Sequence, residues 1–425
     1  MSFSLLAALA IAPFTPAVPT ELSDYLKKPD SVYAFEVGKD QNDTMISLTS
    51  QTWQGNVWKH NLLIRDNAAP IKKGVAVLFI TGNGPNPGDR LLIPAVSGAT
   101  KLPTAFLFGI PNQPLYGFTE DELIAYTFDK YLETQDASWP LLFPMTKSVL
   151  RAMDAIEEST KNSSNPIKKF VISGASKRGW TTWLTGASGD KRVVAIAPMV
   201  IDNLNLSKQM AHQMDIWGQY SEQIEAYTKR GLQAKFTTQA GKHLGEIVDP
   251  YSYRSQIKVP TLIITGSNDP YWAADACSQY YDDLKMPKWL VTVPNVGHNL
   301  GGGAQAIETF GKFCEAVALD KSMPQEKWSM KRVGADQLEV SLSSSRVKLQ
   351  KLVVWGAESA TLDFKESKFV SLATVEVGPG STSVKAVIAL PKNSNAAIFG
   401  EATYVDGSTY RLCCPTQIYR KSTSN

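Results

Sequence analysis

The pattern of apolar and polar positions divides the chain into two parts of different character. Up to about residue 320, short apolar runs typical of buried strands alternate with longer segments of helical periodicity. The expected strands cover residues 44–54, 57–65, 75–81, 104–109, 169–173, 193–198, 260–265 and 288–293, and helical patterns include residues 120–132 and 141–158. This alternation predicts an α/β domain, residues 20–320, with a mostly parallel sheet between two layers of helices.

The segment 203–256 interrupts this rhythm. It holds no strand pattern, and its large apolar residues, among them Met210, Trp217 and Tyr227, fall near helical spacing. We expect this insert to form a helical cap over an active site. The alternative is that its apolar residues only pack the insert onto the domain below.

The pattern changes after residue 321. Short alternating runs follow, such as residues 338–342, 351–355, 384–390 and 396–404, and Gly, Ser and Asn turns separate them. Residues 321–425 are therefore predicted to form an all-β sandwich. Its role could be that of a binding module or of a structural appendage.

The N-terminus has an apolar run of its own. Residues 1–19 resemble the apolar core of a secretory signal peptide, with a small-residue cleavage site near Ala17. No Lys or Arg precedes the run, so a disordered N-terminus is the alternative. A signal peptide would make the protein secreted or periplasmic.

One turn of the α/β part carries candidate chemistry. Residues 168–179 read KKFVISGASKRG, an apolar strand followed by a tight turn of small residues that leads into a helical pattern. This is the layout of a nucleophile elbow with Ser176 at its apex, although Gly179 stands one place later than in G-x-S-x-G. The turn predicts acyl transfer, and the alternative is a serine that only forms a turn or helix cap.

A serine nucleophile needs a histidine and an acid later in the chain. Of the four histidines, His60 precedes the serine, and His212 and His243 follow no strand. His298 follows the apolar run 289–293 and a loop, so it is the candidate base.

The candidate acid is Asp269, in the loop after the strand at 260–265 and 29 residues before His298. This interval leaves room for one helix and one strand. Asp202, after the strand at 193–198, is the rival. Asp269 could also merely cap a helix that starts near Tyr271.

The reaction also needs two donors for the oxyanion. The backbone N–H of Lys177, at the start of the helix, is the first candidate. The second is Gly84, in the loop 81–88, where glycines allow the backbone to approach a ligand closely. That loop could equally be an ordinary Gly/Pro turn.

At this point the chain resembles a known family. Residues 174–187, GASKRGWTTWLTGA, are similar to the signature of the PhoPQ-activated pathogenicity-related proteins. Further segments resemble that family in the same order: residues 111–115, 124–127, 139–142, 197–202, 249–254 and 293–295. The resemblance implies an α/β-hydrolase fold and a Ser/His/Asp triad, and the Ser-Lys-Arg-Gly turn is the family's own form. The family includes secreted proliferation repressors of social amoebae.

Residues beside the serine are candidates for substrate binding. Arg178, with Lys177, could bind a substrate carboxylate or stabilise the oxyanion, or it could pair with a structural carboxylate under the helix. Gln113 and Trp180 are further candidates for the pocket, as is Trp183.

The composition limits which partners and cofactors we expect this protein to bind. A net charge of +3 gives no support for binding nucleic acid, and no apolar run after the N-terminus is long enough to span a membrane. No Cys/His spacing suggests zinc, and we expect no metal or other cofactor. Cys277 and Cys314 could form a disulfide, whereas the neighbours Cys413 and Cys414 would point to opposite faces of a strand.

Two classes of function follow. The first is a serine hydrolase, an esterase or peptidase that cleaves a small-molecule or peptide substrate through Ser176. The second is a secreted signalling or binding protein that keeps the hydrolase scaffold with little or no catalysis, because fold alone does not decide function.

Overall fold

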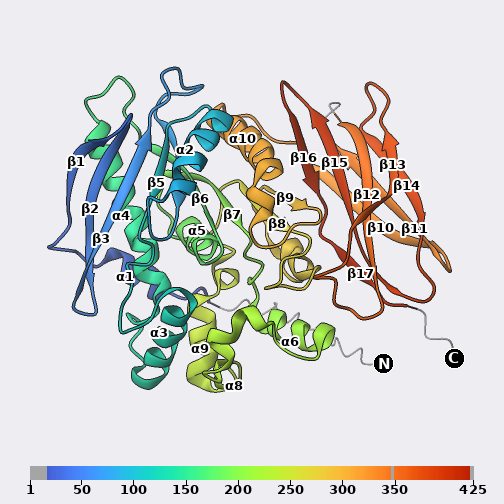
Figure 1. Ribbon diagram of the computed structural model, residues 1–425, viewed down its shortest axis with the longest axis horizontal. Coiled ribbons are helices and arrows are strands. Elements are labelled where there is room, and N and C mark those ends of the chain that lie inside the picture. Colours follow the sequence, from blue (N-terminus) through green and yellow to red (C-terminus); the bar gives the residue numbers. More distant parts are fainter. Residues whose placement is uncertain (1–16, 346–348, 422–425) are drawn as a thin grey trace, which may run out of the picture.

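The computed structural model describes residues 17–345 and 349–421, and a nine-stranded sheet forms the framework of its larger part (Figure 1). Its strand order is β1-β2-β3-β5-β4-β6-β7-β8-β9. The pairs from β1 to β5 are antiparallel, and all pairs from β5 to β9 are parallel. The strands are β1 (Ala34–Asp40), β2 (Asp43–Trp53), β3 (Asn56–Arg65), β4 (Val75–Ile80), β5 (Thr104–Leu107), β6 (Lys169–Ala175), β7 (Val193–Met199), β8 (Thr261–Gly266) and β9 (Lys288–Val293).

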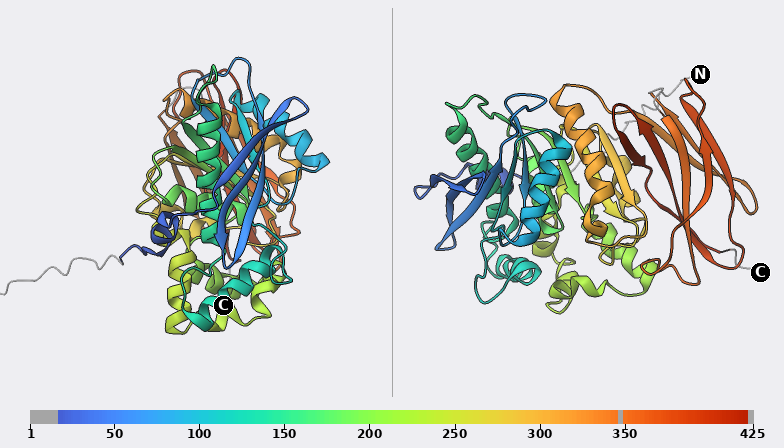
Figure 2. Two further views of the ribbon diagram at one scale, coloured as in Figure 1. Left: turned by 90° about the vertical axis from the view of Figure 1, so that its left-hand side faces the viewer. Right: turned by 45° about the horizontal axis from the view of Figure 1, so that its top comes forward.

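Helices cover both faces of this sheet (Figure 2). Strand β4 is buried along its whole length, and its side chains alternate between two apolar clusters. Leu78 and Ile80 join the cluster that includes α4 (Leu142–Thr160) and α5 (Lys177–Ala187). Val77 and Phe79 join the cluster that includes α2 (Pro87–Thr100) and α10 (Ala304–Ala318). The mostly parallel sheet between two helical layers confirms the predicted α/β-hydrolase fold.

The structure differs from the prediction at two places. Strand β1 was not expected, and it extends the antiparallel edge of the sheet. The helix expected near Tyr271 is absent, because the segment between β8 and β9 forms only two short 3₁₀ turns, η3 (Ala276–Gln279) and η4 (Tyr281–Asp283). Tyr280 and Leu284 from this segment are buried, so the core anchors it without a helix.

The segment between β7 and β8 is helical, as the prediction of a cap requires. It contains α6 (Leu206–Trp217), η1 (Glu222–Ile224), α7 (Glu225–Thr228), α8 (Leu232–Lys235), α9 (Gln239–Val248) and η2 (Pro250–Tyr253). With α3 (Glu120–Thr134) it forms a helical layer at one end of the sheet (Figure 1). Arg230 pairs with Glu122 and Asp129 of α3, and Lys235 pairs with Asp129. The cap is therefore attached to α3 by ion pairs.

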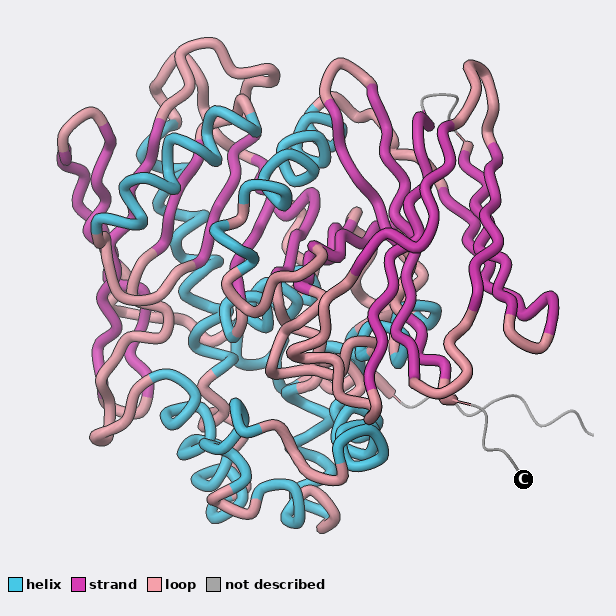
Figure 3. Tube along the Cα trace, turned by 45° about the vertical axis from the view of Figure 1, so that its right-hand side comes forward, coloured by secondary structure: helices cyan, strands magenta, loops and turns pink. Residues whose placement is uncertain are grey.

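The C-terminal part consists of two antiparallel sheets (Figure 3). One contains β10 (Glu326–Gly334), β11 (Gln337–Ser344) and β14 (Ser383–Ala389), and the other contains β12 (Leu349–Ser359), β13 (Val370–Glu376), β15 (Asn395–Val405), β16 (Thr409–Cys413) and β17 (Gln417–Tyr419). Inward residues of both sheets, such as Val340 and Val354, share one apolar cluster. This arrangement is the predicted sandwich.

The sandwich packs tightly against the larger domain. Tyr410 and Leu412 of β16 join the same cluster as Phe310 and Phe313 of α10. The predicted disulfide between Cys277 and Cys314 is wrong, since all four cysteines are free and buried. Cys277 belongs to the cluster on one face of the large sheet and Cys314 to the cluster on the other face.

The N-terminal part of the structure begins with α1 (Glu21–Lys27), which packs on α4 through Leu22 and Tyr25. The predicted signal peptide lies almost entirely outside the described residues. Within residues 17–345 and 349–421, no helix combines the length and apolar character needed to cross a bilayer.

Candidate active site

Ser176 occupies a strained turn between β6 and α5. Its backbone has φ 59° and ψ −129°, a conformation that a residue with a side chain rarely adopts. The turn is held on both sides, because the Ser176 N–H donates to Met199 O at 2.9 Å and the Trp180 N–H donates to Ser176 O at 3.0 Å. This is the geometry of a nucleophile elbow at a helix N-terminus.

Two glycines make the turn possible. A Cβ on Gly174 would lie 2.8 Å from Arg178 O, and a Cβ on Gly179 would lie 2.8 Å from Met199 O. Both distances are too short for a side chain. Gly179, which stands one place later than the last glycine of G-x-S-x-G, thus lets helix α5 approach the neighbouring strand β7 closely.

His298 and Asp269 meet on neighbouring loops. Asp269 follows β8 and His298 follows β9, and His298 Nδ1 lies 2.8 Å from Asp269 Oδ2. Gly266 lets the loops approach, because a Cβ there would lie 2.5 Å from Val296 O. An imidazole held through Nδ1 presents its other nitrogen, Nε2, for proton transfer.

The pair is held by further contacts. Asp269 Oδ1 accepts the backbone N–H of Tyr271 at 3.0 Å, so the carboxylate also caps a turn. The ring of Tyr271 stacks on the His298 ring, with 4.2 Å between the ring centroids. His298 Nε2 is buried and has no hydrogen-bond partner among the described residues. It is therefore available to a group that enters the site.

The rival acid Asp202 is occupied elsewhere. Its Oδ1 accepts a hydrogen bond from the Tyr280 hydroxyl at 2.5 Å. Burial raises the pKa of Asp202 to about 7, the Tyr280 hydrogen bond lowers it and the nearby Asp269 charge raises it further. The geometry favours Asp269 as the partner of His298.

The other three histidines have structural partners. His60 is buried between Ser50 and the Gly109 carbonyl, and burial lowers its pKa to about 4. His212 Nε2 lies 2.6 Å from Asp275, and His243 Nε2 lies 2.8 Å from Glu21. None of the three lines the cavity that contains Ser176.

Two acidic residues at the start of α3 neutralise the cations beside the serine. Arg178 donates two hydrogen bonds to Glu120, at 2.6 and 2.8 Å, and a third to Ile110 O at 2.6 Å. Lys177 Nζ pairs with Glu120 at 3.0 Å and Asp121 at 2.9 Å. Although burial opposes ionisation of Glu120, Arg178 and Lys177 lower its pKa to about 2. Arg178 is thus paired with a structural carboxylate, which was the alternative to a role in binding a substrate carboxylate.

Sequence reasoning did not assign partners to these cations. The only signal was the acidic run 120–122 at the start of a helical pattern. Gln113 belongs to the same network. Its Nε2 donates to the Glu120 carboxylate, and its Oε1 accepts the Glu120 N–H at 2.7 Å. Neither Gln113 nor Arg178 lines the cavity, so their predicted substrate contacts have no support in this geometry.

The two candidate oxyanion donors lie in different surroundings. Lys177 is the first residue of α5, where backbone N–H groups have no partner within the helix. Gly84 lines a separate hollow with His60, Phe108 and Gly109. This position does not favour Gly84 as the second donor.

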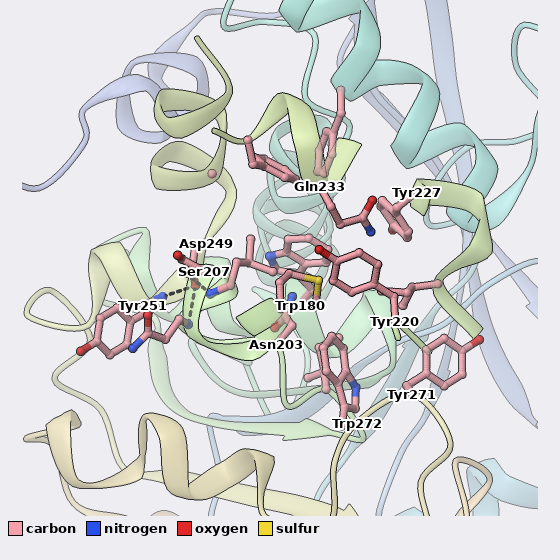
Figure 4. Close-up of a pocket in the computed structure, with 18 of the residues that line it drawn as sticks. Trp180, Asn203, Ser207, Tyr220, Tyr227, Gln233, Asp249, Tyr251, Tyr271 and Trp272 are labelled. Carbon is pink, nitrogen blue, oxygen red and sulfur yellow. Dashed lines mark hydrogen bonds between the residues drawn. The ribbon is translucent and has the colours of Figure 1, made fainter. Parts of the chain in front are cut away.

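Ser176 and His298 line one cavity of about 850 Å³ between the sheet and the cap. Figure 4 shows other residues of its wall, among them Trp180, Tyr220 and Tyr271. Cap residues Met210, Tyr220 and Phe236 form part of the wall, as expected for an insert that covers a site. Trp180, a candidate for the pocket, lines the cavity and donates through Nε1 to Val248 O at 2.7 Å, whereas Trp183 is fully buried in the core. Sequence reasoning missed Asn203, Tyr271 and Trp272, which also line it.

The ends of the cap are joined beside this cavity. Asp249 accepts the backbone N–H groups of Asn205, Leu206 and Tyr251 at 2.8 to 3.2 Å (Figure 4). Burial raises the pKa of Asp249 to about 6, although these three hydrogen bonds lower it. In the part of the chain that the structure describes, no group of three or more His, Cys, Asp or Glu could hold a metal ion.

Known proteins are similar to this chain in sequence or in structure. Autocrine proliferation repressor protein A of Dictyostelium discoideum is 28% identical over 446 residues, which cover 94% of this chain and 89% of the relative. Among solved structures, acetyl xylan esterase from Paenibacillus sp. R4 is 15% identical, with a TM-score of 0.48 over 69% of this chain and 90% of that chain. Acetyl xylan esterase 1 from Thermoanaerobacterium sp. JW/SL YS485 is 13% identical, with a TM-score of 0.46 over 72% and 95% of the two chains.

The family model described as PhoPQ-activated pathogenicity-related protein matches residues 22–365. This match covers most of the α/β domain and reaches into the sandwich, and it agrees with the resemblance seen in residues 174–187. The protein belongs to the PhoPQ-activated pathogenicity-related family.

Proposed function

We propose that this protein is a serine hydrolase that cleaves an ester or amide bond through an acyl-enzyme on Ser176. The observation that carries the proposal is a strained serine at a helix N-terminus that shares a cavity with His298, whose Nδ1 is bonded to Asp269. A serine that only capped the helix would not require this conformation. Its side chain makes no cap hydrogen bond.

Each residue has a defined role in the proposed reaction. Ser176 Oγ attacks the acyl carbon, and His298 Nε2 takes the proton and returns it to the leaving group. Asp269 fixes the tautomer of His298 through Nδ1 and stabilises the imidazolium. The Lys177 N–H at the start of α5 donates to the oxyanion, a contact worth about 3 kcal/mol in the transition state. Water then attacks the acyl-enzyme with His298 as general base.

A fluorophosphonate probe tests the proposal directly, because it reacts covalently with an activated serine. It should label the wild-type protein but not Ser176→Ala. Ser207→Ala is the matched control, since Ser207 lines the same cavity without a histidine–aspartate pair assigned to it. Labelling that persists in Ser176→Ala would assign the nucleophile elsewhere, and a folded wild type that is not labelled would refute the hydrolase. A panel of p-nitrophenyl esters and aminoacyl p-nitroanilides then separates an esterase from a peptidase.

A second candidate is a secreted signalling protein that uses the same cavity for binding. The name of the Dictyostelium relative, an autocrine proliferation repressor, favours it. In this case a ligand would occupy the cavity without turnover, and Ser176→Ala would keep the biological effect of the wild-type protein. Loss of that effect in Ser176→Ala, together with loss of probe labelling, would favour the hydrolase.

A further inference from the structure

The cavity beside Ser176 suits a bulky apolar group. Its volume of about 850 Å³ is within the range of pockets that enclose a drug-sized molecule. Lys177, the cation nearest the serine in sequence, is already paired with Glu120 and Asp121. Most of the wall is apolar or aromatic, including Phe128, Trp180, Met210, Ile224, Phe236 and Trp272.

Three side chains in this wall have polar atoms without a partner among the described residues: His298 at Nε2, Trp272 at Nε1, and Asn203 at both atoms of its carboxamide. Asn203 follows β7 and lines the cavity, and only 1% of its surface is exposed. Neither its Oδ1 nor its Nδ2 has a hydrogen-bond partner among the described residues. Figure 4 shows Asn203 beside Trp180 and Trp272. Buried amide groups are nearly always paired, so this one is available to a ligand.

We propose that Asn203 binds an amide group of the substrate, and that the substrate is an ester or amide that joins this amide to a bulky apolar group. The inference rests on the proposed hydrolase function. The Asn203 carboxamide offers an NH₂ group as donor and an oxygen as acceptor. A substrate amide offers the complementary C=O and N–H groups. N-acylated derivatives of large apolar amino acids combine both features.

Two esters with the same leaving group test this inference. N-acetyl-phenylalanine p-nitrophenyl ester and 3-phenylpropanoic acid p-nitrophenyl ester differ only in the acetamido group. Replacement Asn203→Leu removes the carboxamide and keeps the branched shape of the side chain. We expect the ratio of kcat/KM for the two esters to fall about tenfold in Asn203→Leu, with the phenylpropanoate rate nearly unchanged.

Controls separate the possible outcomes. Asn112→Leu removes an asparagine outside the cavity, whose Oδ1 accepts the Lys59 N–H, and should leave the ratio unchanged. Asn203→Leu should not lower the Tm, because it removes polar atoms that have no protein partner. An unchanged ratio, or a lower Tm with both rates equally reduced, would overturn the inference. Failure of Ser176 labelling would instead refute the hydrolase itself. If Asn203→Leu does not fold, Asn203→Ala serves as the second variant.

A different observation concerns the loops that carry the histidine and the aspartate. The loop 360–369, between β12 and β13 of the sandwich, contacts both of them. Nδ2 of Asn268, next to Asp269, lies within hydrogen-bond distance of the carbonyls of residues 364, 365 and 367, at 2.8 to 3.0 Å. Asn295, three residues before His298, exchanges two hydrogen bonds with the backbone of Phe369 at 2.7 and 2.9 Å.

The loop is itself anchored. Phe364 and Phe369 are buried, and the Phe369 ring lies 5.7 Å from the ring of Phe399. Ser267 links the two asparagines, because its hydroxyl donates to Asn268 Oδ1 at 2.6 Å and accepts the Asn295 N–H at 2.8 Å. We infer that Asn268 and Asn295 are positioning residues through which the sandwich fixes the distance between Asp269 and His298. This inference also rests on the proposed function.

The sandwich supplies a matched control. Asn395 Nδ2 lies within hydrogen-bond distance of three carbonyls, those of residue 359 at the end of β12 and of residues 360 and 361 in the loop, but it contacts neither loop of the site. We expect Asn268→Ala to lower kcat at least tenfold with little change in KM, and to move the apparent pKa of the kcat profile. Asn395→Ala should lower the Tm to a similar extent and keep kcat within about twofold.

Equal loss of Tm in both variants without a change in kcat or in the pH profile would show that Asn268 serves the fold alone. If Asn268→Ala does not fold, Asn295→Asp is the second variant. It keeps the acceptor for the Phe369 N–H but loses the donor, and kcat should again fall more than KM changes. Ser176 labelling of the wild type, measured in parallel, reports on the proposed function independently.

Discussion

Replacement of Asp202 by asparagine should stabilise the protein increasingly as the pH rises. The side chain is 8% exposed, and burial raises its pKa from the ordinary value of 3.8 to about 7. Between these two values the unfolded chain has lost the proton and the native chain retains it, so native stability falls as the pH rises. Below about pH 4 there is no penalty, and above about pH 7 the penalty is complete.

The size of the stability penalty follows from the pKa shift of Asp202. Each pH unit of pKa difference corresponds to about 1.4 kcal/mol, so the whole shift is worth about 4 kcal/mol. Asparagine cannot ionise, and its Oδ1 can still accept the hydrogen bond from Tyr280. The advantage of Asp202→Asn over the wild type should therefore grow by about 3 kcal/mol between about pH 5 and about pH 8.

Urea unfolding of both proteins across this range measures the difference. Hydrolysis should persist in Asp202→Asn, because His298 is bonded to Asp269. An advantage that does not change with pH would refute the reasoning, since it would mean that Asp202 is ionised in both states. Loss of hydrolysis in a folded Asp202→Asn would make Asp202 the acid instead.

Three further predictions concern the serine turn and its surroundings. Asp269→Asn should lower kcat by about 10⁴-fold in ester hydrolysis, because the tautomer of the histidine is no longer fixed, and a loss below tenfold would contradict its role. Gly179→Ala should cost about 1–3 kcal/mol in urea unfolding, because a Cβ there has no space, whereas Gly98→Ala in α2, with nothing within 4 Å, should gain about 0.5–1 kcal/mol. A larger loss of stability in Gly98→Ala than in Gly179→Ala would refute the packing argument. Glu120→Gln should lower stability by about 2 kcal/mol, because Arg178 loses its charged partner, and an unchanged unfolding midpoint would show that this ion pair is dispensable.

The sequence predicted the fold well because the parallel strands are continuous apolar runs. Strands β4, β6 and β8 are buried on both faces, so each run is recognisable without knowledge of its neighbours. Strand β1 was missed, and most of its residues are exposed or half-buried. Such a strand is defined by its pairing partner more than by its own residues.

The triad remains a prediction, but the order of residues along the chain was enough to select His298 for Ser176 and to leave Asp269 and Asp202 as the candidate acids, of which Asp269 was preferred. Each follows a strand of the parallel sheet, and the carboxyl ends of such strands meet at one edge. The ion pair between Arg178 and Glu120 joins residues 58 positions apart, and charge alone does not identify partners at that distance. The unpartnered state of Asn203 is a property of packing that no local pattern encodes.

The four buried cysteines have a consequence for how the protein can be studied. All are free, and burial raises the pKa of each thiol. A thiolate is the reactive form, so an alkylating reagent modifies these side chains only after the structure around them opens. The rate of thiol modification therefore measures how often the native structure opens, without any added label.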